Sequence, residues 1–226
     1  MNKLILFDID GTLTEHPVGH IEAHAVAYQK VFGIYGSIYM IDYDGKPDRR
    51  ITKEVLTKLG IAEAEIEQKM PEFLQVMGEY YDSIKLYIKP KLLPGVINTL
   101  ERLSADENVL LGIVTGNIER IAWDKLEAAG INGYFKLGGF GNESDDRPEL
   151  VKLAIERARM EHGFDCDVIY LIGDTPVDMN AGNAAGVNTV GVATGSYSQE
   201  VLREAGATTT LPDLSDIQLL ENALST

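Results

Sequence analysis

The sequence predicts an α/β fold, in which a parallel β-sheet forms the core and a helical module is inserted after the first strand. Short apolar runs alternate with helical patterns, two of these runs end in acidic residues, and one long stretch carries helical patterns only. Alternating strands and helices are typical of a parallel sheet covered by helices on both faces. Ligands of such sheets bind beyond the carboxyl ends of the strands, so the residues after each run are the functional candidates.

The predicted elements follow from the period of the apolar residues. Segments 94–103 and 147–160 repeat apolar residues every three or four positions, which is typical of helices. The predicted strands are the apolar runs 4–9, 109–114, 134–137, 168–172 and 189–192.

The stretch from about residue 15 to residue 91 breaks this alternation. It offers helical patterns around 55–59 and 73–80, but no convincing strand longer than 38–41. The segment 89–95 that follows has the proline and glycine content of a linker. We therefore expect residues 1–14 and 92–226 to form the α/β core. Residues 15–91 are expected to form a helical cap that acts as a lid.

Composition excludes several partners. The 226 residues include 20 Lys and Arg against 35 Asp and Glu, a formal net charge of −15. Nucleic acids and anionic membrane surfaces bind basic patches, so neither is an expected partner. No apolar run reaches the roughly 18 residues of a membrane-spanning helix. The single Cys166 cannot form an intramolecular disulfide, so we expect a cytoplasmic protein.

The first predicted strand ends in two carboxylates, Asp8 and Asp10, which lie on one side of the extended chain. Because like charges repel, the pair predicts either a divalent metal site or a carboxyl with a raised pKa that acts as a general acid. A plain Asp-Gly turn is the alternative. The same Asp-x-Asp-Gly pattern recurs at 42–45, and there we interpret Asp42 and Asp44 as residues that only satisfy a turn in a lid loop.

Polar residues also follow the strands predicted at 109–114 and 168–172. Thr115, Gly116 and Asn117 precede a helical pattern and predict a small anion cradle, unless Thr115 or Asn117 simply caps the helix. Asp174 and Asp178 offer the oxygen ligands that suit Mg²⁺. Helix capping is an alternative for Asp178.

Two further groups of side chains have open interpretations. Arg147 begins a helical pattern, where its guanidinium either binds phosphate oxygens or is a surface cation beside Asp145 and Asp146. His20 and His24 lack a third ligand motif, so we interpret them as part of a polar helix face.

These motifs, in this order and in these strand contexts, resemble the four motifs of the haloacid dehalogenase superfamily. The resemblance covers the whole chain and is closest to phosphoglycolate-phosphatase-like members. It implies a Rossmann-like core with a helical cap inserted after the first motif. The matching residues are Asp8-x-Asp10-Gly11-Thr12, Thr115-Gly116, a cation before Pro148, and Gly173-Asp174 followed by Asp178.

The resemblance also implies roles. Asp8 attacks phosphorus and becomes an aspartyl phosphate, and Asp10 acts as acid and base. Mg²⁺ is held by Asp8, by the backbone carbonyl of Asp10 and by Asp174, with Asp178 close by. The transferring phosphoryl group is bound by Thr115, Gly116, Asn117 and Arg147.

Arg147 departs from the family pattern, which more often has lysine there. Lys136 and Lys152 are the nearby lysines that could take the role instead. In the cap, Lys46 and Arg49 lie where family members place a loop that closes on the leaving group. They are candidates to bind a carboxylate or a second phosphate of the substrate.

The expected function is Mg²⁺-dependent hydrolysis of a small phosphorylated metabolite by a monomer or homodimer. Phosphoglycolate and sugar phosphates are the leading substrates. A phosphomutase of the β-phosphoglucomutase type shares the motifs and the cap position, and is the enzymatic alternative. A non-catalytic phosphate-binding protein that retains the fold is the other.

Overall fold

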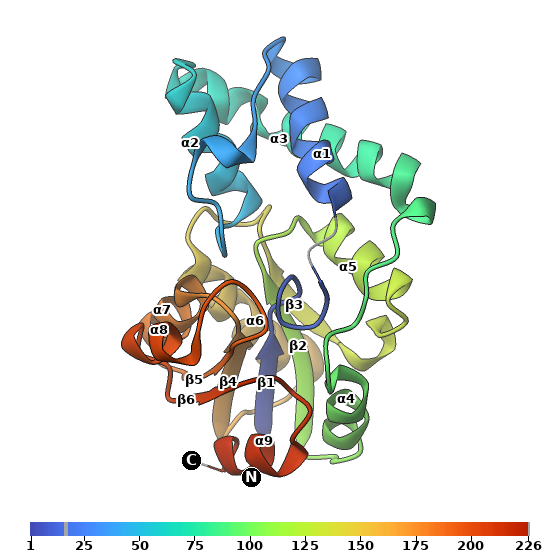
Figure 1. The fold of residues 1–226 in the computed structure, drawn as a ribbon, viewed down its shortest axis with the longest axis vertical. Coiled ribbons are helices and arrows are strands. Elements are labelled where there is room, and N and C mark those ends of the chain that lie inside the picture. The colour runs from blue at the N-terminus through green and yellow to red at the C-terminus, as the bar shows by residue number, and fades with distance from the viewer. Residues whose placement is uncertain (16–17, 226) are drawn as a thin grey trace.

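The core of the protein is a parallel sheet. The computed structural model describes residues 1–15 and 18–225. Within them the sheet has six strands in the order β3-β2-β1-β4-β5-β6, which is the order of Rossmann folds and confirms the predicted α/β class (Figure 1). The strands are β1 Lys3–Phe7, β2 Val109–Thr115, β3 Leu137–Phe140, β4 Val168–Gly173, β5 Asn188–Val192 and β6 Thr209–Leu211.

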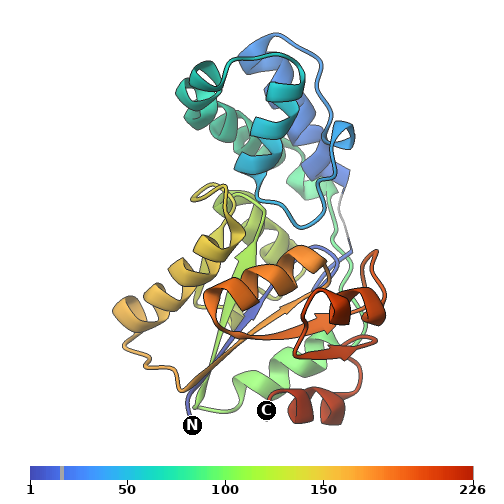
Figure 2. The ribbon, with the colours of Figure 1, turned by 90° about the vertical axis from the view of Figure 1, so that its left-hand side faces the viewer.

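Helices cover both faces of the sheet (Figures 1 and 2). Ile5 and Phe7 of β1 pack with α4, α5 and α9, whereas Leu4 and Leu6 pack with α6 and α7. Strand residues alternate between faces, so a continuous apolar run such as β1 is what a sheet buried on both sides requires. The helices of the core are α4 Val96–Ser104, α5 Glu119–Ala128, α6 Arg147–His162, α7 Pro176–Ala185, α8 Gln199–Glu204 and α9 Ile217–Ala223.

Residues 18–87, which lie between β1 and α4, form a separate group of helices above the sheet, which we call the helical module (Figure 2). Its apolar core includes Tyr28, Val55 and Phe73, and Ile118 and Ile121 at the start of α5 join the same cluster. Its elements are α1 Val18–Ala27, the π-helical turn η1 Tyr28–Phe32, the 3-10 turn η2 Ile38–Met40, α2 Asp48–Lys58, α3 Glu63–Ile84 and the 3-10 turn η3 Lys85–Tyr87.

The two chain segments that link the helical module to the core lie side by side. The amide of Glu15 donates to the carbonyl of Lys91 at 2.9 Å, and Thr14 and Leu92 form an antiparallel bridge. The boundaries after residues 14 and 91 stay a prediction from the sequence. None of the described helices is both long and apolar enough to cross a membrane.

The structure differs from the predicted elements in the third strand. Residues 132–134 form the 3-10 turn η4 Asn132–Tyr134, and β3 begins only at Leu137. Gly138 and Gly139 hide this strand because glycine is uncommon in strands. A Cβ at Gly139 would lie 2.0 Å from the carbonyl oxygen of Leu150, so glycine is what allows α6 to pack closely on β3. The short β6 is too brief to show a period.

Candidate active site

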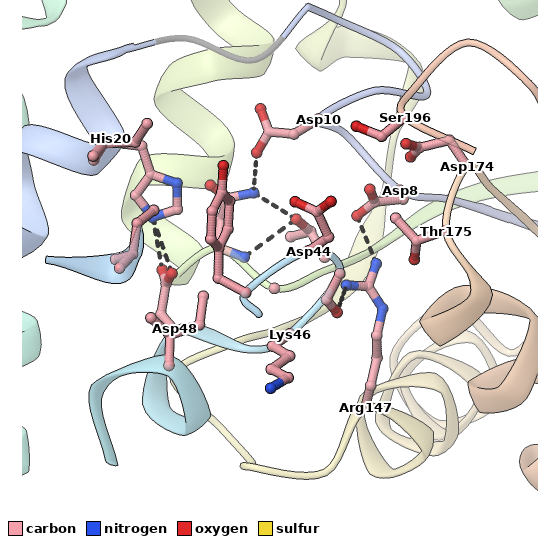
Figure 3. Close-up of a pocket in the computed structure, with 18 of the residues that line it drawn as sticks. Asp8, Asp10, His20, Asp44, Lys46, Asp48, Arg147, Asp174, Thr175 and Ser196 are labelled. Atoms are coloured by element: carbon pink, nitrogen blue, oxygen red, sulfur yellow. Dashed lines mark hydrogen bonds and ion pairs between the residues drawn. The ribbon is translucent and has the colours of Figure 1, made fainter. Parts of the chain in front are cut away.

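A pocket of about 100 Å³ lies between the helical module and the carboxyl ends of β1, β2 and β4 (Figure 3). Eight of the ten predicted site residues meet there from segments far apart in the chain. Those that line the pocket are Asp8, Asp10, Lys46, Thr115, Gly116, Asn117, Arg147 and Asp174. Asp178 lies beside it, in contact with Arg147.

Asp8 is the first residue after β1, and its amide donates to the carbonyl of Ile172 at 2.9 Å, which fixes it between β1 and β4. Arg147 Nη2 donates to Asp8 Oδ1 at 2.7 Å and lies 2.6 Å from Asp178 Oδ1. Burial, reinforced by the charges of Asp178 and Asp10, raises the pKa of Asp8 to about 7 against the opposing effect of Arg147. Asp8 is therefore a buried carboxylate that needs positive charge to stay ionised.

Arg147 is the cation beside Asp8. Its side chain is 3% exposed at the start of α6, and its Nη1 also donates to the carbonyl of Gly45 in the helical module. Lys136 and Lys152 are exposed and lie outside the lining of the pocket. The surface-cation interpretation of Arg147 is therefore wrong.

Three buried carboxylates gather beside Arg147. Asp8, Asp174 and Asp178 each present an oxygen within 4.8 Å of the others. Burial and repulsion from Asp8 and Asp178 raise the pKa of Asp174 well above its usual value. Cβ atoms at Gly11 and Gly195 would lie 2.3 and 1.8 Å from Asp174 Oδ2, so bare glycine backbone surrounds this carboxylate. A cluster of buried acids in a tight cradle fits a small, hard divalent cation.

Asp178 also caps α7. The amide and the hydroxyl of Thr175 donate to Asp178 Oδ2 at 3.1 and 2.7 Å, and the amide of Asp178 donates back to Thr175 Oγ1 at 3.2 Å. This is a reciprocal capping box. The capping interpretation therefore applies to Oδ2, while Oδ1 faces Arg147.

The carboxylate of Asp10 is held by a lysine that was not predicted. Lys125 Nζ lies 2.6 Å from Asp10 Oδ2, and Asn117 Nδ2 donates to the same oxygen at 2.8 Å. Burial alone would raise the pKa of Asp10, but Lys125 and His20 hold this pKa below its usual value. The other oxygen, Oδ1, is buried and has no hydrogen-bond partner among the described residues. That oxygen is available to exchange a proton with a ligand.

A sequence signal for Lys125 exists. It lies three and four positions after Ala122 and Ile121 on the apolar stripe of α5, and its side chain is 0% exposed. A buried ammonium requires a charged or polar partner. A lysine within an apolar helical stripe therefore indicates an acid from another element, even though spacing does not say which one.

Thr115 and Gly116 lie at the end of β2. Thr115 Oγ1 accepts from the amide of Asn117 at 3.2 Å and from Asn117 Nδ2 at 2.6 Å, which leaves its O–H to donate to a ligand. A Cβ at Gly116 would lie 2.3 Å from the carbonyl oxygen of Lys46, so the helical module approaches the core closely here. Neither Thr115 nor Asn117 caps α5, since its N-cap is Ile118.

A carboxylate of the helical module binds the N-terminus of α5 instead. The amide of Ile118 donates to Asp48 Oδ2 at 2.8 Å, and the amide of Asp48 donates to the carbonyl of Gly116 at 2.8 Å. His20 Nε2 and His24 Nε2 each lie 3.0 Å from the Asp48 carboxylate. Burial alone would raise the pKa of Asp48, but His20 and His24 hold this pKa well below its usual value. The positive end of this helix is thus satisfied by protein, not left open for phosphate.

The expected polar helix face around His20 and His24 is wrong. His24 is 1% exposed, because its ring packs between Asp48 and the aromatic residues Tyr28 and Phe73. A buried carboxylate from 24 residues away in the chain is what holds it there.

Lys46 and Arg49 of the helical module already have acidic partners. Lys46 lines the pocket, but its Nζ lies 2.7 Å from Glu54 Oε2. Arg49 lies outside the lining of the pocket and binds Asp145 at 2.8 Å and Glu67 at 3.1 Å. The structure therefore does not bring Arg49 to the site.

The second Asp-x-Asp-Gly segment divides between solvent and pocket. Asp42 is exposed, whereas Asp44 lines the pocket, where its Oδ2 accepts from Tyr197 Oη at 3.5 Å. The expectation that both acids only satisfy a turn is wrong for Asp44.

Residues 5–192 match the haloacid dehalogenase-like hydrolase family. The chain belongs to this family. The probable phosphatase IndB of Dickeya dadantii (strain 3937) is 25% identical, with 99% of this chain and 95% of that protein covered. A phosphoglycolate phosphatase of Neisseria meningitidis serogroup A is 27% identical, with 91% and 86% covered. The crystal structure of a hydrolase from Pseudomonas syringae, 24% identical with 100% of both chains covered, has the same fold, with a TM-score of 0.72.

Proposed function

We propose that this hydrolase is a phosphatase that cleaves a small phosphomonoester in two steps, with Asp8 as the nucleophile. The observation that carries the proposal is the setting of Asp8, between Arg147 and two further buried acids, with the unpartnered Oδ1 of Asp10 in the same pocket. The names of the phosphatase relatives support a phosphoester substrate.

In the first step, the Asp8 oxygen that Arg147 does not bind forms a bond to phosphorus, and the ester P–O bond breaks. Asp10 takes up a proton when the negatively charged ester binds beside it, and donates this proton to the leaving oxygen. The phosphoryl oxygens accept hydrogen bonds from the guanidinium of Arg147, the hydroxyl of Thr115 and the amide of Gly116. Such donors stabilise the transition state because they are already in position when charge develops.

In the second step, a water molecule attacks phosphorus and the bond to Asp8 breaks, which releases phosphate and restores the carboxylate. Asp10 accepts the proton of the water through Oδ1. The cation of Lys125 supports this role, because it favours the ionised form of Asp10. Asn117 and Lys125 hold Oδ2, so the reacting oxygen keeps a fixed position.

A divalent cation fits the buried acids, and we propose Mg²⁺. Asp8 and Asp174 are its side-chain ligands, the backbone carbonyl of Asp10 is a further one, and Asp178 lies close by. Bound there, the ion supplies positive charge that neutralises the phosphoryl group. The raised pKa values of Asp8 and Asp174 support this assignment, since both carboxylates need a cation to ionise together.

The dimensions of the pocket favour a small substrate. A volume of about 100 Å³ suits a compact leaving group, so phosphoglycolate and small sugar phosphates are the proposed substrates. The proposal includes a cytoplasmic location, supported by the single Cys166, which is a free thiol. A monomer or homodimer is the proposed assembly.

Phosphate release tests the proposal. The purified protein with Mg²⁺ should release phosphate from a panel of glycolate, sugar, nucleotide and amino-acid phosphates, and Asp8→Asn should lose at least about a thousandfold of that activity. The absence of phosphate release from every ester, while Mg²⁺ still binds, would overturn the proposal. A hexose 1-phosphate that is isomerised and not hydrolysed would show a mutase instead.

A further inference from the structure

We infer that Asp44 selects the leaving group, so that this enzyme acts on phosphoesters whose alcohol part presents hydroxyl or ammonium groups and no carboxylate. The inference rests on the proposed phosphatase function and narrows its substrate class: of the two substrates proposed above, it favours small sugar phosphates over phosphoglycolate, which carries a carboxylate. It depends on where Asp44 lies, how firmly it is held, and which charges surround it.

Asp44 belongs to the loop between η2 and α2, which reaches from the helical module into the pocket. It shares the lining of the pocket with Asp8 and Asp10, and Figure 3 shows its side chain between theirs in projection. Its hydrogen-bond partner is Tyr197 Oη, at 3.5 Å from Oδ2, on the loop that follows β5. The carboxylate therefore faces the space that a leaving group occupies, and most of its acceptor capacity is left for a ligand.

The backbone on the C-terminal side of Asp44 is fixed to the core. The carbonyl of Gly45 accepts from Arg147, and the amide of Asp48 donates to the carbonyl of Gly116 at 2.8 Å. Gly45 has a φ of +70°, and a Cβ there would lie 2.5 Å from Thr175 Oγ1. Asp44 thus keeps its place relative to the reacting groups while the helical module is in contact with the core.

The charges of the pocket are unevenly matched. Each lysine and arginine in its described lining already has an acidic partner: Lys46 binds Glu54, Lys125 binds Asp10, and Arg147 binds Asp8. The imidazole rings of His20 and His24 both bind Asp48. Asp44 has no cation partner among the described residues and stands outside the cluster of Asp8, Asp174 and Asp178. The pocket therefore offers an acceptor in need of a donor, and no spare cation for a carboxylate of the substrate.

This uneven matching of charges should favour some leaving groups and disfavour others. A hydroxyl or an ammonium of the leaving group can donate to Asp44, and binding improves. A carboxylate would be placed against a partly buried like charge, which is disfavoured because neither group finds a counter-ion there. Polyol phosphates and amino-alcohol phosphates both carry such a donor on the leaving group. Comparing one ester of each class shows which of the two the enzyme prefers.

The test compares kcat/KM for glycerol 3-phosphate, ethanolamine phosphate and 2-phosphoglycolate, each divided by the value for methyl phosphate with the same protein and Mg²⁺. We expect the native protein to prefer one or both of the first two over 2-phosphoglycolate by at least about tenfold, and Asp44→Asn to reduce that preference at least about fivefold. Asp42→Asn, which removes the same charge from an exposed position two residues away, is the matched control and should leave the preference unchanged. Tyr197→Phe should shift it in the same direction as Asp44→Asn, by less.

A native preference for 2-phosphoglycolate, or an Asp44→Asn preference within about twofold of the native value, would overturn the inference. Calorimetric binding of the same esters to Asp8→Asn protein measures the preference without turnover. Lack of phosphate release from every ester therefore counts against the proposed phosphatase, whereas lack of a binding preference counts against the role of Asp44.

Discussion

Segments 8–11 and 42–45 share the pattern Asp-x-Asp-Gly, yet the molecule uses them differently. In the first, which follows β1, Asp8 pairs with Arg147 and Asp10 pairs with Lys125. In the second, which follows a 3-10 turn, Asp42 is exposed and Asp44 lines the pocket with no cation partner among residues 1–15 and 18–225. The preceding element decides the outcome, because a buried strand carries its acids into the core where they must find positive charge.

The glycine is what the two segments have in common. Gly11 and Gly45 both have positive φ, of 86° and 70°. Cβ atoms there would meet Asp174 Oδ2 at 2.3 Å and Thr175 Oγ1 at 2.5 Å, respectively. Each glycine therefore lets its segment approach the same loop after β4. The pattern predicts a close approach of backbone, while the role of its acids depends on the surroundings.

The largest expected effect distinguishes Asp10 of the first segment from Asp42 of the second, which is the control. Asp10→Asn should lower kcat about a thousandfold, because it removes the group that donates and accepts the proton. Asp42→Asn should leave kcat within about twofold. Phosphate release at saturating ester measures both. If Asp10→Asn retained more than a tenth of the native rate, Asp10 would not be the acid and base.

Lys125→Met tests whether the cation partner distinguishes Asp10 from Asp44. It leaves Asp10 buried without its ammonium, so the free energy of unfolding should fall by about 3 kcal/mol. Lys136→Met, at an exposed lysine, is the matched control and should change it by no more than about 0.5 kcal/mol. Urea unfolding monitored by circular dichroism gives both values. If both variants lost the same free energy of unfolding, the Lys125–Asp10 pair would contribute no more to stability than an exposed lysine does.

Removal of Mg²⁺ tests which acids hold the proposed ion. Chelation should lower Tm by about 5 °C, which corresponds to about 2 kcal/mol for a domain of this size, because the ion binds only the folded protein. Asp174→Asn should abolish the response to Mg²⁺, whereas Asp44→Asn should retain it. A response lost in Asp44→Asn would place Asp44 with the metal ligands and not with the leaving group.

The smallest expected effect concerns Asp48, which anchors segment 42–45. Its pKa is lower in the folded protein than its ordinary 3.8, so its contribution to stability is complete above pH 3.8. Below that pH the unfolded chain takes up a proton that the folded protein does not, and stability falls. Between pH 4 and 3, Asp48→Asn should lose about 1 kcal/mol less than the native protein. Thermal unfolding across this range measures the difference, and equal slopes would contradict it.

The fold could be predicted from the sequence, because the pattern of apolar residues that identifies a strand or a helix lies within that element alone. The alternation of buried runs with amphipathic helices is enough to indicate a parallel sheet. Asp8, Asp10 and Asp174 could be selected as well, because each follows such a run and the carboxyl ends of parallel strands share one edge. Strand β3 could not be predicted in this way, because Gly139 is required by α6, which packs closely on the strand, and not by any pattern within the strand itself.

The partners of these residues could not be predicted, because they come from other elements. Lys125 binds an acid 115 positions away, and Asp48 binds an amide 70 positions away. Spacing along one helix carries no information about either contact. For the same reason Arg49 was selected by its position in a loop, whereas its neighbours Asp145 and Glu67 already satisfy its charge.

The pairing of Thr14 with Leu92 and of Glu15 with Lys91 has a consequence for how such proteins diversify. Because the insertion leaves and re-enters the core at adjacent points, the core can accept a different insertion there without a change in its own connections. Asp44 belongs to the inserted segment, whereas Asp8 and Asp10 belong to the core. The residue proposed to choose the substrate and the residues proposed to carry the bond chemistry therefore lie on separable parts of one chain.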